Sequence, residues 1–353
     1  MKNLMKNSET NSAKLFLGIA TAVVILLSGP KVNAQEGSDS LHRTAQVSFF
    51  YPVGSNGLST SYSHNYSFNM LYGANAGVDG FELGGLTNYN KGSVRGAQIA
   101  GISNNTVGDV SGLQLAGIIN GNKGAMQGVQ ISGIANFNSD STQGIQLSTI
   151  NFSNGNTKGF QLGVVNYAKK LKGANLGIVN VVGDAEEGIP IGLISVVKNG
   201  YYEIEATGGK AINGNINFKM GVERFYTIFK VGYSSFKNDP VYSYGLGFGT
   251  LFTFSEKHKM SVDLSTNGIV YDDEWNVWNT KNILNKLDVT YRNQLTPKLS
   301  LLAGPSLNHY TSEVKVGDSF GTLRTIGNLK TNENDERKKS MWIGFNAGLA
   351  FRF

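Results

Sequence analysis

Apolar and polar residues alternate along the last thirteen positions of the chain, Met341 to Phe353. Every second residue is apolar, and the residues between them are mostly small or polar; the apolar positions are Ile343, Phe345, Ala347, Leu349, Phe351 and Phe353. A period of two predicts a β-strand whose two faces meet different surroundings. The polar face carries little charge, which is typical of a barrel wall with lipid outside and a polar lumen inside.

The same alternation predicts further strands upstream, over residues 61–70, 216–223, 242–254, 260–265, 286–292 and 299–308. After residue 215 the connections between them alternate in length. Short turns are expected near Arg224, Ser255–His258 and Thr296, and longer loops at Lys237–Pro240, Tyr271–Ile283 and Ser312–Ser340. Outer-membrane barrels have short periplasmic turns and longer external loops, so this parity predicts that the last strand ends at the periplasm.

A second pattern fills the centre of the chain, where one phrase occurs eight times between Gly80 and Ser195. It reads glycine, an apolar residue, a glutamine or its substitute and an aliphatic residue, and it usually closes with asparagine. The phrase begins at Gly80, Gly96, Gly112, Gly128, Gly144, Gly159, Gly173 and Gly188, with spacings of 16 residues four times and then 15, 14 and 15. A period this short indicates one supersecondary unit stacked on copies of itself.

Two all-β architectures fit the repeats. In the first, each repeat in residues 80–198 is one transmembrane strand, within the roughly 9–11 residues that such a strand needs. Together with N-terminal barrel strands in residues 35–79 and C-terminal barrel strands in residues 199–353, this predicts an antiparallel outer-membrane β-barrel of about 18 strands. Such a barrel is wide enough for an aqueous channel. Strand length and the separation of faces favour this architecture.

In the alternative, the repeats coil into a parallel β-solenoid and a barrel of about ten strands forms separately. From Gln146 onward the distance from Gln to Asn drops from six residues to five, which would exchange the two faces of a plain strand. Pro190 would also remove a ladder hydrogen bond from a central strand. In both architectures the candidate lumen or ladder residues are the same: Gln98, Gln114, Gln130, Gln146, Gln161, Asn104, Asn120 and Asn136.

Residues 1–34 are typical of a secretory signal peptide. Lys2, Lys6 and Lys14 precede the apolar run Leu15–Gly29, and Val32-Asn33-Ala34 resembles a cleavage site. The apolar run is shorter than the roughly 20 residues of a membrane-spanning helix. This segment holds four Lys and one Glu, so half of the net charge of +6 lies in it, and the remainder is too mild to argue for nucleic acid. The chain contains no cysteine, which excludes disulfides and a thiolate nucleophile.

No catalytic, cofactor or metal motif has supporting context. The glycine-rich run 245–250 lies inside an alternating strand with no helix after it, unlike a phosphate-binding loop. The four histidines show no metal-ligand spacing. Acidic residues 272–274, beside Trp275 and Trp278, are interpreted as a solvated external loop rather than a cation or glycan site. The sequence therefore predicts a protein that is not an enzyme and needs no cofactor.

Three features resemble a known family: repeats of the form Gly-x-Gln-Leu/Ile-x-Gly-Ile/Val-x-Asn, the segment Lys-Asn-Gly-Tyr-Tyr-Glu at 198–203, and Gly-Val-Glu-Arg-Phe-Tyr at 221–226. They are similar to the surface-repeat-containing outer-membrane proteins of Gram-negative bacteria, over nearly all of the chain after the signal peptide. Phe351 and Phe353 likewise resemble the C-terminal signature of outer-membrane barrels.

The resemblance implies an outer-membrane location, with membrane lipid and the barrel-insertion machinery as partners, the latter through the C-terminal strand. It carries no known substrate or catalytic residue. We therefore expect a non-enzymatic barrel that is a channel or a surface-exposed structural protein. The alternative is an adhesin, in which a repeat module anchored by a barrel binds a partner or a glycan.

Overall fold

The computed structural model describes residues 41–353, apart from 186, 237–238, 272–280, 317–318, 322, 324–327 and 335. The predicted signal peptide, residues 1–34, lies outside the described residues. The described part of the chain contains no helix long and apolar enough to cross a membrane. The chain divides into two units, one ending at Ala125 and the other beginning at Met126.

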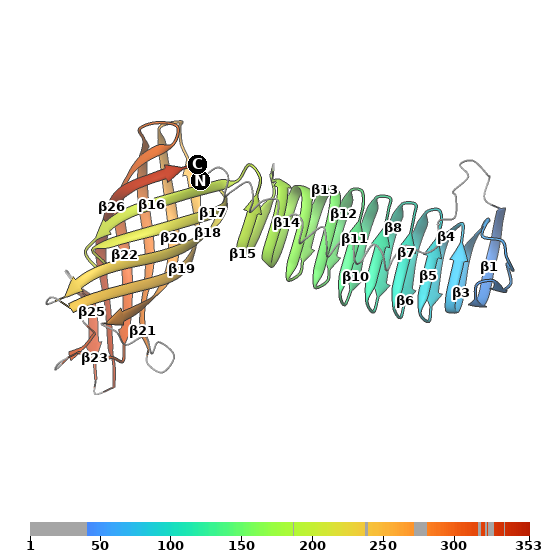
Figure 1. Ribbon diagram of the computed structural model, residues 1–353, viewed down its shortest axis with the longest axis horizontal. Helices are drawn as coiled ribbons and strands as arrows, with labels where there is room; N and C mark the ends of the chain where they lie inside the picture. Colours follow the sequence, from blue (N-terminus) through green and yellow to red (C-terminus); the bar gives the residue numbers. More distant parts are fainter. Residues whose placement is uncertain are drawn as a thin grey trace. The chain divides into compact units, whose positions relative to one another are not determined.

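The first unit is a parallel β-solenoid, coloured blue to green in Figure 1. Its strands are β1 (Leu41–Phe50), β2 (Val53–Gly54), β3 (Tyr62–Asn75), β4 (Gly77–Gly84), β5 (Thr87–Asn90), β6 (Val94–Ala100), β7 (Ser103–Thr106), β8 (Val110–Ala116) and β9 (Ile119–Asn122). From β4 onward each coil contributes two strands, and equivalent positions of successive coils pair in register. Gln98, for example, pairs with Gln114. The solenoid that the sequence offered as the alternative architecture is therefore confirmed.

Residues 35–79 do not contribute barrel strands, contrary to expectation. β1 pairs in parallel with β3, and β3 pairs in parallel with β4, so the described part of this segment belongs to the solenoid. The alternation in β3 holds from Tyr66 to Asn69, because Ser67 and Asn69 are buried while Tyr66 and Phe68 are exposed. An irregularity between His64 and Tyr66 interrupts it, so that His64 is buried as well. A polar interior with an apolar exterior is also the pattern of a barrel with a polar lumen, and the alternation alone does not separate the two.

The second unit continues with further parallel coils: β10 (Met126–Ser132), β11 (Ala135–Asn138), β12 (Thr142–Leu147), β13 (Ile150–Leu162), β14 (Val165–Asp184) and β15 (Ile189–Val197). The one-residue slip after Gln146 falls at a corner, where Ala135 pairs with Ile150 and the strands on either side stay in register. Pro190 lies in β15, the last strand of this sheet, so it removes no hydrogen bond from a central strand.

A closed antiparallel barrel of eight strands completes the second unit (Figure 1). The strands are β16 (Tyr201–Gly209), β17 (Gly214–Val222), β18 (Phe225–Phe236), β19 (Asp239–Thr253), β20 (His258–Tyr271), β21 (Asn282–Gln294), β22 (Leu299–Ser312) and β26 (Lys338–Arg352). Pairing of β26 with β16 closes it. The last connection holds the short strands β23 (Lys315–Val316), β24 (Ser319–Phe320) and β25 (Asn328–Glu333). A continuous barrel of about 18 strands is therefore wrong. The separate barrel has fewer than about ten strands because the N-terminal strands lie in the solenoid.

The two ends of the barrel differ. Three short turns, at 223–224, 254–257 and 295–298, lie at the end where β16 begins at Tyr201 and β26 finishes at Arg352. The long connections 272–281 and 313–337 lie at the opposite end. The predicted parity fails at one place, since Phe236 pairs with Asp239 where a longer loop was expected at Lys237–Pro240.

Large apolar side chains cover the outside of the barrel. They are exposed on alternate positions of successive strands, and they include Ile216, Val231, Tyr244, Phe248, Leu264, Leu301, Phe345 and Leu349. The residues between them face inward and are buried. This wall reverses the usual arrangement of a soluble protein, because its apolar surface faces outward and its polar surface faces inward.

Candidate functional site

The interior of the barrel contains four buried cations and four buried carboxylates. These side chains are at most 6 % exposed: Lys219, Lys230, Lys286, Arg292, Glu203, Glu205, Asp263 and Asp288. Their formal charges sum to zero. An isolated charge would be expensive to bury, so a balanced and hydrogen-bonded set is the physically accessible way to fill such an interior with ionised groups.

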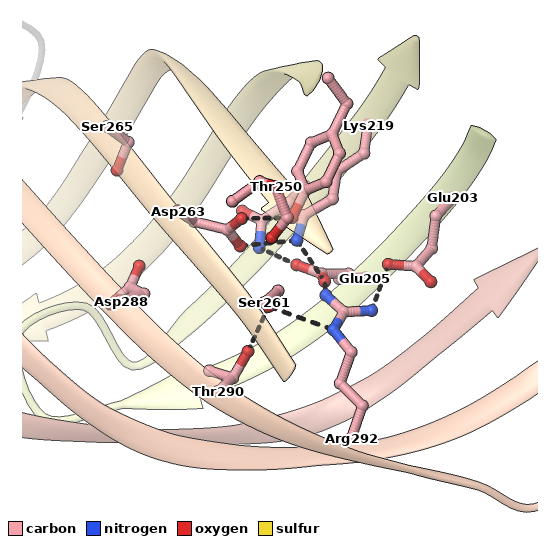
Figure 2. Close-up of polar contacts among 12 residues, drawn as sticks. Glu203, Glu205, Lys219, Thr250, Ser261, Asp263, Ser265, Asp288, Thr290 and Arg292 are labelled. Atoms are coloured by element: carbon pink, nitrogen blue, oxygen red, sulfur yellow. Dashed lines mark hydrogen bonds and ion pairs between the residues drawn. The ribbon is translucent and has the colours of Figure 1, made fainter. Parts of the chain in front are cut away.

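Arg292 contacts two carboxylates, those of Glu203 and Glu205 (Figure 2). Its Nη1 donates to Glu203 Oε1 at 2.6 Å, its Nη2 donates to Glu205, and its Nε donates to Ser261 Oγ at 3.1 Å. Glu203 also accepts a hydrogen bond from the Tyr201 hydroxyl at 2.7 Å. Arg292 lies on β21 and both glutamates lie on β16, so the contact crosses the lumen.

Lys219 extends the same network. Its Nζ lies 2.6 Å from Glu205 Oε1 and 2.6 Å from Asp263 Oδ2, and the Tyr226 hydroxyl donates to Asp263 at 2.6 Å. A second group of ion pairs lies nearer the end of the barrel with the long loops. There the Nζ atoms of Lys230 and Lys286 lie 3.4 and 3.3 Å from the Asp288 carboxylate.

These side chains fill the lumen. The space left between the two charged groups is a cavity of about 20 Å³, which is room for about one water molecule. Toward the long-loop end an apolar cluster of Val241, Ile269, Leu284, Tyr310 and Trp342 continues the packing. An eight-stranded barrel is only wide enough for its side chains to fill it, and the described residues do fill it.

The glutamine candidates lie inside the solenoid, and none of them lines the barrel. Gln98, Gln114, Gln130, Gln146 and Gln161 are completely buried. Within the first unit Gln114 Nε2 donates to Gln98 Oε1 at 2.7 Å. Within the second unit Gln146 donates to Gln130 at 2.8 Å and Gln161 donates to Gln146 at 2.7 Å. Gln146 is thus a donor to one coil and an acceptor from the next.

The asparagine candidates form a second buried ladder. Asn104 Nδ2 donates both to Asn120 Oδ1 at 2.9 Å and to the Leu115 carbonyl at 2.9 Å. Asn136 repeats this arrangement with Asn151 Oδ1 at 3.0 Å and the Leu147 carbonyl at 3.1 Å. The backbone bond ties the corner of one coil to the strand of the next, which explains why the phrase closes with asparagine.

Glu82 occupies the glutamine position in the coil before Gln98, at the N-terminal end of the glutamine ladder. Its Oε2 accepts from Gln98 at 2.8 Å and from Asn90 at 2.6 Å, while its Oε1 accepts from Ser67, Asn69 and Asn75. Burial raises the pKa of this carboxyl above its ordinary value, and the hydrogen bonds offset part of that rise. A carboxylate suits this position because it accepts bonds from all sides and donates none.

The ladder stops at the other end of the repeats. Asn175 takes the place of glutamine there, and its side-chain amide has no hydrogen-bond partner among the described residues; the same holds for Gln161 Oε1. Asparagine is one methylene shorter than glutamine and does not reach Gln161. On the far side of Asn175 the equivalent position is Pro190, which has no amide side chain to offer.

The other candidates are dispersed. His64 is buried, and burial together with nearby Arg43 lowers its pKa to about 4. No group of three His, Asp or Glu side chains that could hold a metal ion occurs in the described part of the chain. Acidic residues 272–274 and Trp275 and Trp278 lie outside the described residues. Phe351 and Phe353 are exposed at the outside of the barrel, and the Phe353 ring lies 6.3 Å from that of Phe218.

Sequence reasoning did not single out the charged network of the barrel. The available signal was the presence of Lys219, Asp263 and Arg292 on the polar faces of otherwise alternating strands. Their partners lie far away in sequence, since Arg292 and Glu203 are 89 positions apart, and only closure of the barrel brings them together. Comparison of the chain with protein-family models, with curated proteins and with solved structures found no match.

Proposed function

We propose that this chain is a non-enzymatic outer-membrane protein in which the barrel is an anchor and the solenoid is a module held on the periplasmic side. The apolar outer wall of the barrel supports membrane insertion, because a water-exposed wall with so many large apolar side chains would be unstable against association. The predicted signal peptide and the resemblance to outer-membrane proteins support the same location.

One observation carries the orientation. The solenoid joins the barrel at Tyr201, at the end that also bears the three short turns, while the long connections lie at the opposite end. Outer-membrane barrels place short turns in the periplasm and long loops outside the cell. On this rule the solenoid is periplasmic, and the protein is not a surface adhesin.

A channel is the weaker candidate. Eight strands enclose a lumen that is already filled by four ion-paired cations, four carboxylates and an apolar cluster. Opening an aqueous path would require breaking buried ion pairs, which is costly when a charge is left without its partner. The filled lumen therefore supports an anchoring role for the barrel.

Single cysteines test the orientation, and the absence of native cysteine makes the experiment clean. Lys330→Cys places a thiol near the long-loop end, and Lys158→Cys places one on the solenoid; both lysines are exposed. In intact cells a membrane-impermeant maleimide should label Lys330→Cys only, and Lys158→Cys should react after the outer membrane is permeabilised. Labelling of Lys158→Cys in intact cells would reverse the proposed orientation, and recovery of the protein in a soluble fraction would remove the membrane anchor.

A further inference from the structure

The solenoid of the second unit has an apolar groove on its outside. Two rows of side chains, aliphatic except for Thr149, run from coil to coil. One is formed by Leu147, Leu162 and Leu176 and the other by Thr149, Val164 and Ile178. Between the rows lie only the small residues Ser148, Gly163 and Gly177. The rows and the small residues between them enclose a groove of about 510 Å³.

The rows are exposed although they are apolar. Leu162, Val164, Leu176 and Ile178 are each between 40 and 53 % exposed. The polar ladders occupy the interior of the coils, so the aliphatic residues of the repeat are on the outside. Because the corner after Gln146 is one residue shorter, the members of the two rows in each coil are two positions apart, as Leu162 and Val164 are. A single small residue separates them. The slip in the repeat and the groove therefore occur in the same coils.

The groove offers a ligand no hydrogen bonds along its floor. The amide of Ser148 donates to the Leu162 carbonyl at 3.1 Å, and the amide of Gly163 donates to the Leu176 carbonyl at 3.1 Å. A polypeptide strand that added to this face would need unpaired backbone groups, and a sugar would need polar partners or an aromatic platform. None of the nine residues that line the groove is charged or aromatic. This chemistry fits an unbranched hydrocarbon chain.

The coil that follows the groove packs against the outer wall of the barrel. The next coil carries Ile191, Gly192 and Leu193 at the equivalent positions, and the Gly192 carbonyl accepts a hydrogen bond of 2.7 Å from Thr227 Oγ1. Thr227 lies between the inward-facing Tyr226 and Ile228, so it faces outward. It is nevertheless only 1 % exposed, because β15 packs against this part of β18. The apolar rows thus continue to the lipid-facing wall.

The groove accommodates part of one acyl chain. Strands of a sheet are about 4.8 Å apart, so the three coils that line the groove, from Leu147 to Ile178, span about 10 Å. The hydrocarbon core of a bilayer is about 30 Å thick, so the acyl chains of one leaflet reach about 15 Å.

We propose that this groove binds an acyl chain of a membrane lipid, which enters from the leaflet that faces the short turns of the barrel. The proposal rests on the proposed function, because the barrel must be in a membrane with its short turns toward the solenoid. The ligand is held by apolar contact with the two aliphatic rows, and its headgroup remains in water.

A photoreactive lipid tests this. The full chain is reconstituted into phosphatidylcholine vesicles that contain a trace of phosphatidylcholine with a diazirine near the end of one acyl chain. After illumination, the labelled residues are identified by mass spectrometry. We expect labelling at residues 147–149, 162–164 and 176–178 as well as on the barrel wall. The double variant Leu162→Gln/Ile178→Gln should lower labelling of the groove about tenfold or more, since two aliphatic contacts are lost.

Val196→Gln is the matched control, because Val196 is an equally exposed aliphatic residue of the same solenoid outside the groove. It should leave groove labelling unchanged. Labelling of the barrel wall without the groove would overturn the acyl-chain site and leave the proposed function standing. Absence of labelling from both places would overturn the proposed function as well. Cross-links between two copies through Leu162 or Ile178 would assign the groove to self-association instead.

Discussion

At the residue scale, amide side chains share the interior of the solenoid with buried apolar residues such as Val94 and Val110. A buried Gln or Asn has donors and acceptors on one group, so copies stacked at the strand spacing satisfy each other without water. Gln146 meets this requirement, since it donates to Gln130 at 2.8 Å and accepts from Gln161 at 2.7 Å. The glutamine row ends differently on its two sides. Glu82 supplies extra acceptors at one end, whereas Asn175 lacks a hydrogen-bond partner at the other.

Glu82 should make the first unit pH-sensitive. Its folded-state pKa is raised, so the folded state holds the proton more tightly than the unfolded chain does. The stabilisation is fully present below the ordinary pKa of 4.5 and is lost as the pH rises above it. We therefore expect the opening free energy of residues 77–90, measured by hydrogen exchange, to fall as the pH increases from about 4.5 toward neutrality.

The variant Glu82→Gln, which cannot titrate, should abolish that dependence. Asp79→Asn is the control, because the Asp79 side chain is 64 % exposed and makes only a 3.8 Å surface contact with Arg95. It should keep the slope of the native protein. A slope of the same sign and size in Glu82→Gln would show that another group is responsible.

At the element scale, the glycine that opens each repeat is required by the stacking of coils. Gly112 has a φ of +133°, which residues with a side chain rarely adopt. A Cβ atom there would lie 2.0 Å from the Gly96 carbonyl oxygen of the preceding coil. The residue is therefore fixed both by its own backbone conformation and by the close approach of its neighbour.

Gly112→Ala should destabilise the coils around it by about 3 kcal/mol, from backbone strain and from the displaced carbonyl. Faster hydrogen exchange in β6 and β8 would report the loss. Gly57→Ala separates the two causes, because Gly57 also has a positive φ but has open space around its Cβ position. Its effect should be confined to about 1 kcal/mol. Equal effects of both variants would rule out the stacking explanation.

At the scale of the whole molecule, the barrel depends on a network that joins strands distant in sequence. Arg292→Met leaves Glu203 and Glu205 without their guanidinium partner. Loss of one member of a buried ion pair costs about 3–5 kcal/mol. We expect the barrel to lose its SDS-resistant, fast-migrating form at a clearly lower temperature.

Lys338→Met is the matched control, since Lys338 pairs with Glu333 at 3.6 Å in a partly exposed position. Exposed pairs contribute about 0–1 kcal/mol, so its melting temperature should remain close to that of the native barrel. A native-like Arg292→Met barrel would mean that the network does not stabilise the closed form.

The filled lumen also predicts the electrical behaviour of the whole protein. Folded protein inserted into planar bilayers should give no steady current, because ion-paired side chains and an apolar cluster occupy the lumen and leave only about 20 Å³ between the two charged groups. Insertion is verified separately by protection of the barrel from protease. Reproducible current steps from folded protein with verified insertion would favour a channel over an anchor as the function of the barrel.

The sequence by itself determined the period of the repeats, the separation of polar from apolar faces and six barrel strands, those that overlap residues 216–223, 242–254, 260–265, 286–292, 299–308 and 341–352. These are local properties, since an alternation of two and a period of 16 are visible in any stretch of the chain. The candidate amides could be picked out for the same reason, because stacking requires the same residue once in every coil.

Only the tertiary structure decided which surroundings the polar faces meet. Alternation specifies that one face is polar, and it does so equally for a barrel lumen and for a solenoid interior. The choice depends on which strand each strand pairs with. The strand of Lys219 pairs with the preceding strand of the same hairpin, whereas the strand of Gln98 pairs with the equivalent strand one coil away. The number of barrel strands, the neutral charge network around Arg292 and the groove beside Leu162 all follow from that pairing, because each needs side chains that the chain sequence keeps apart.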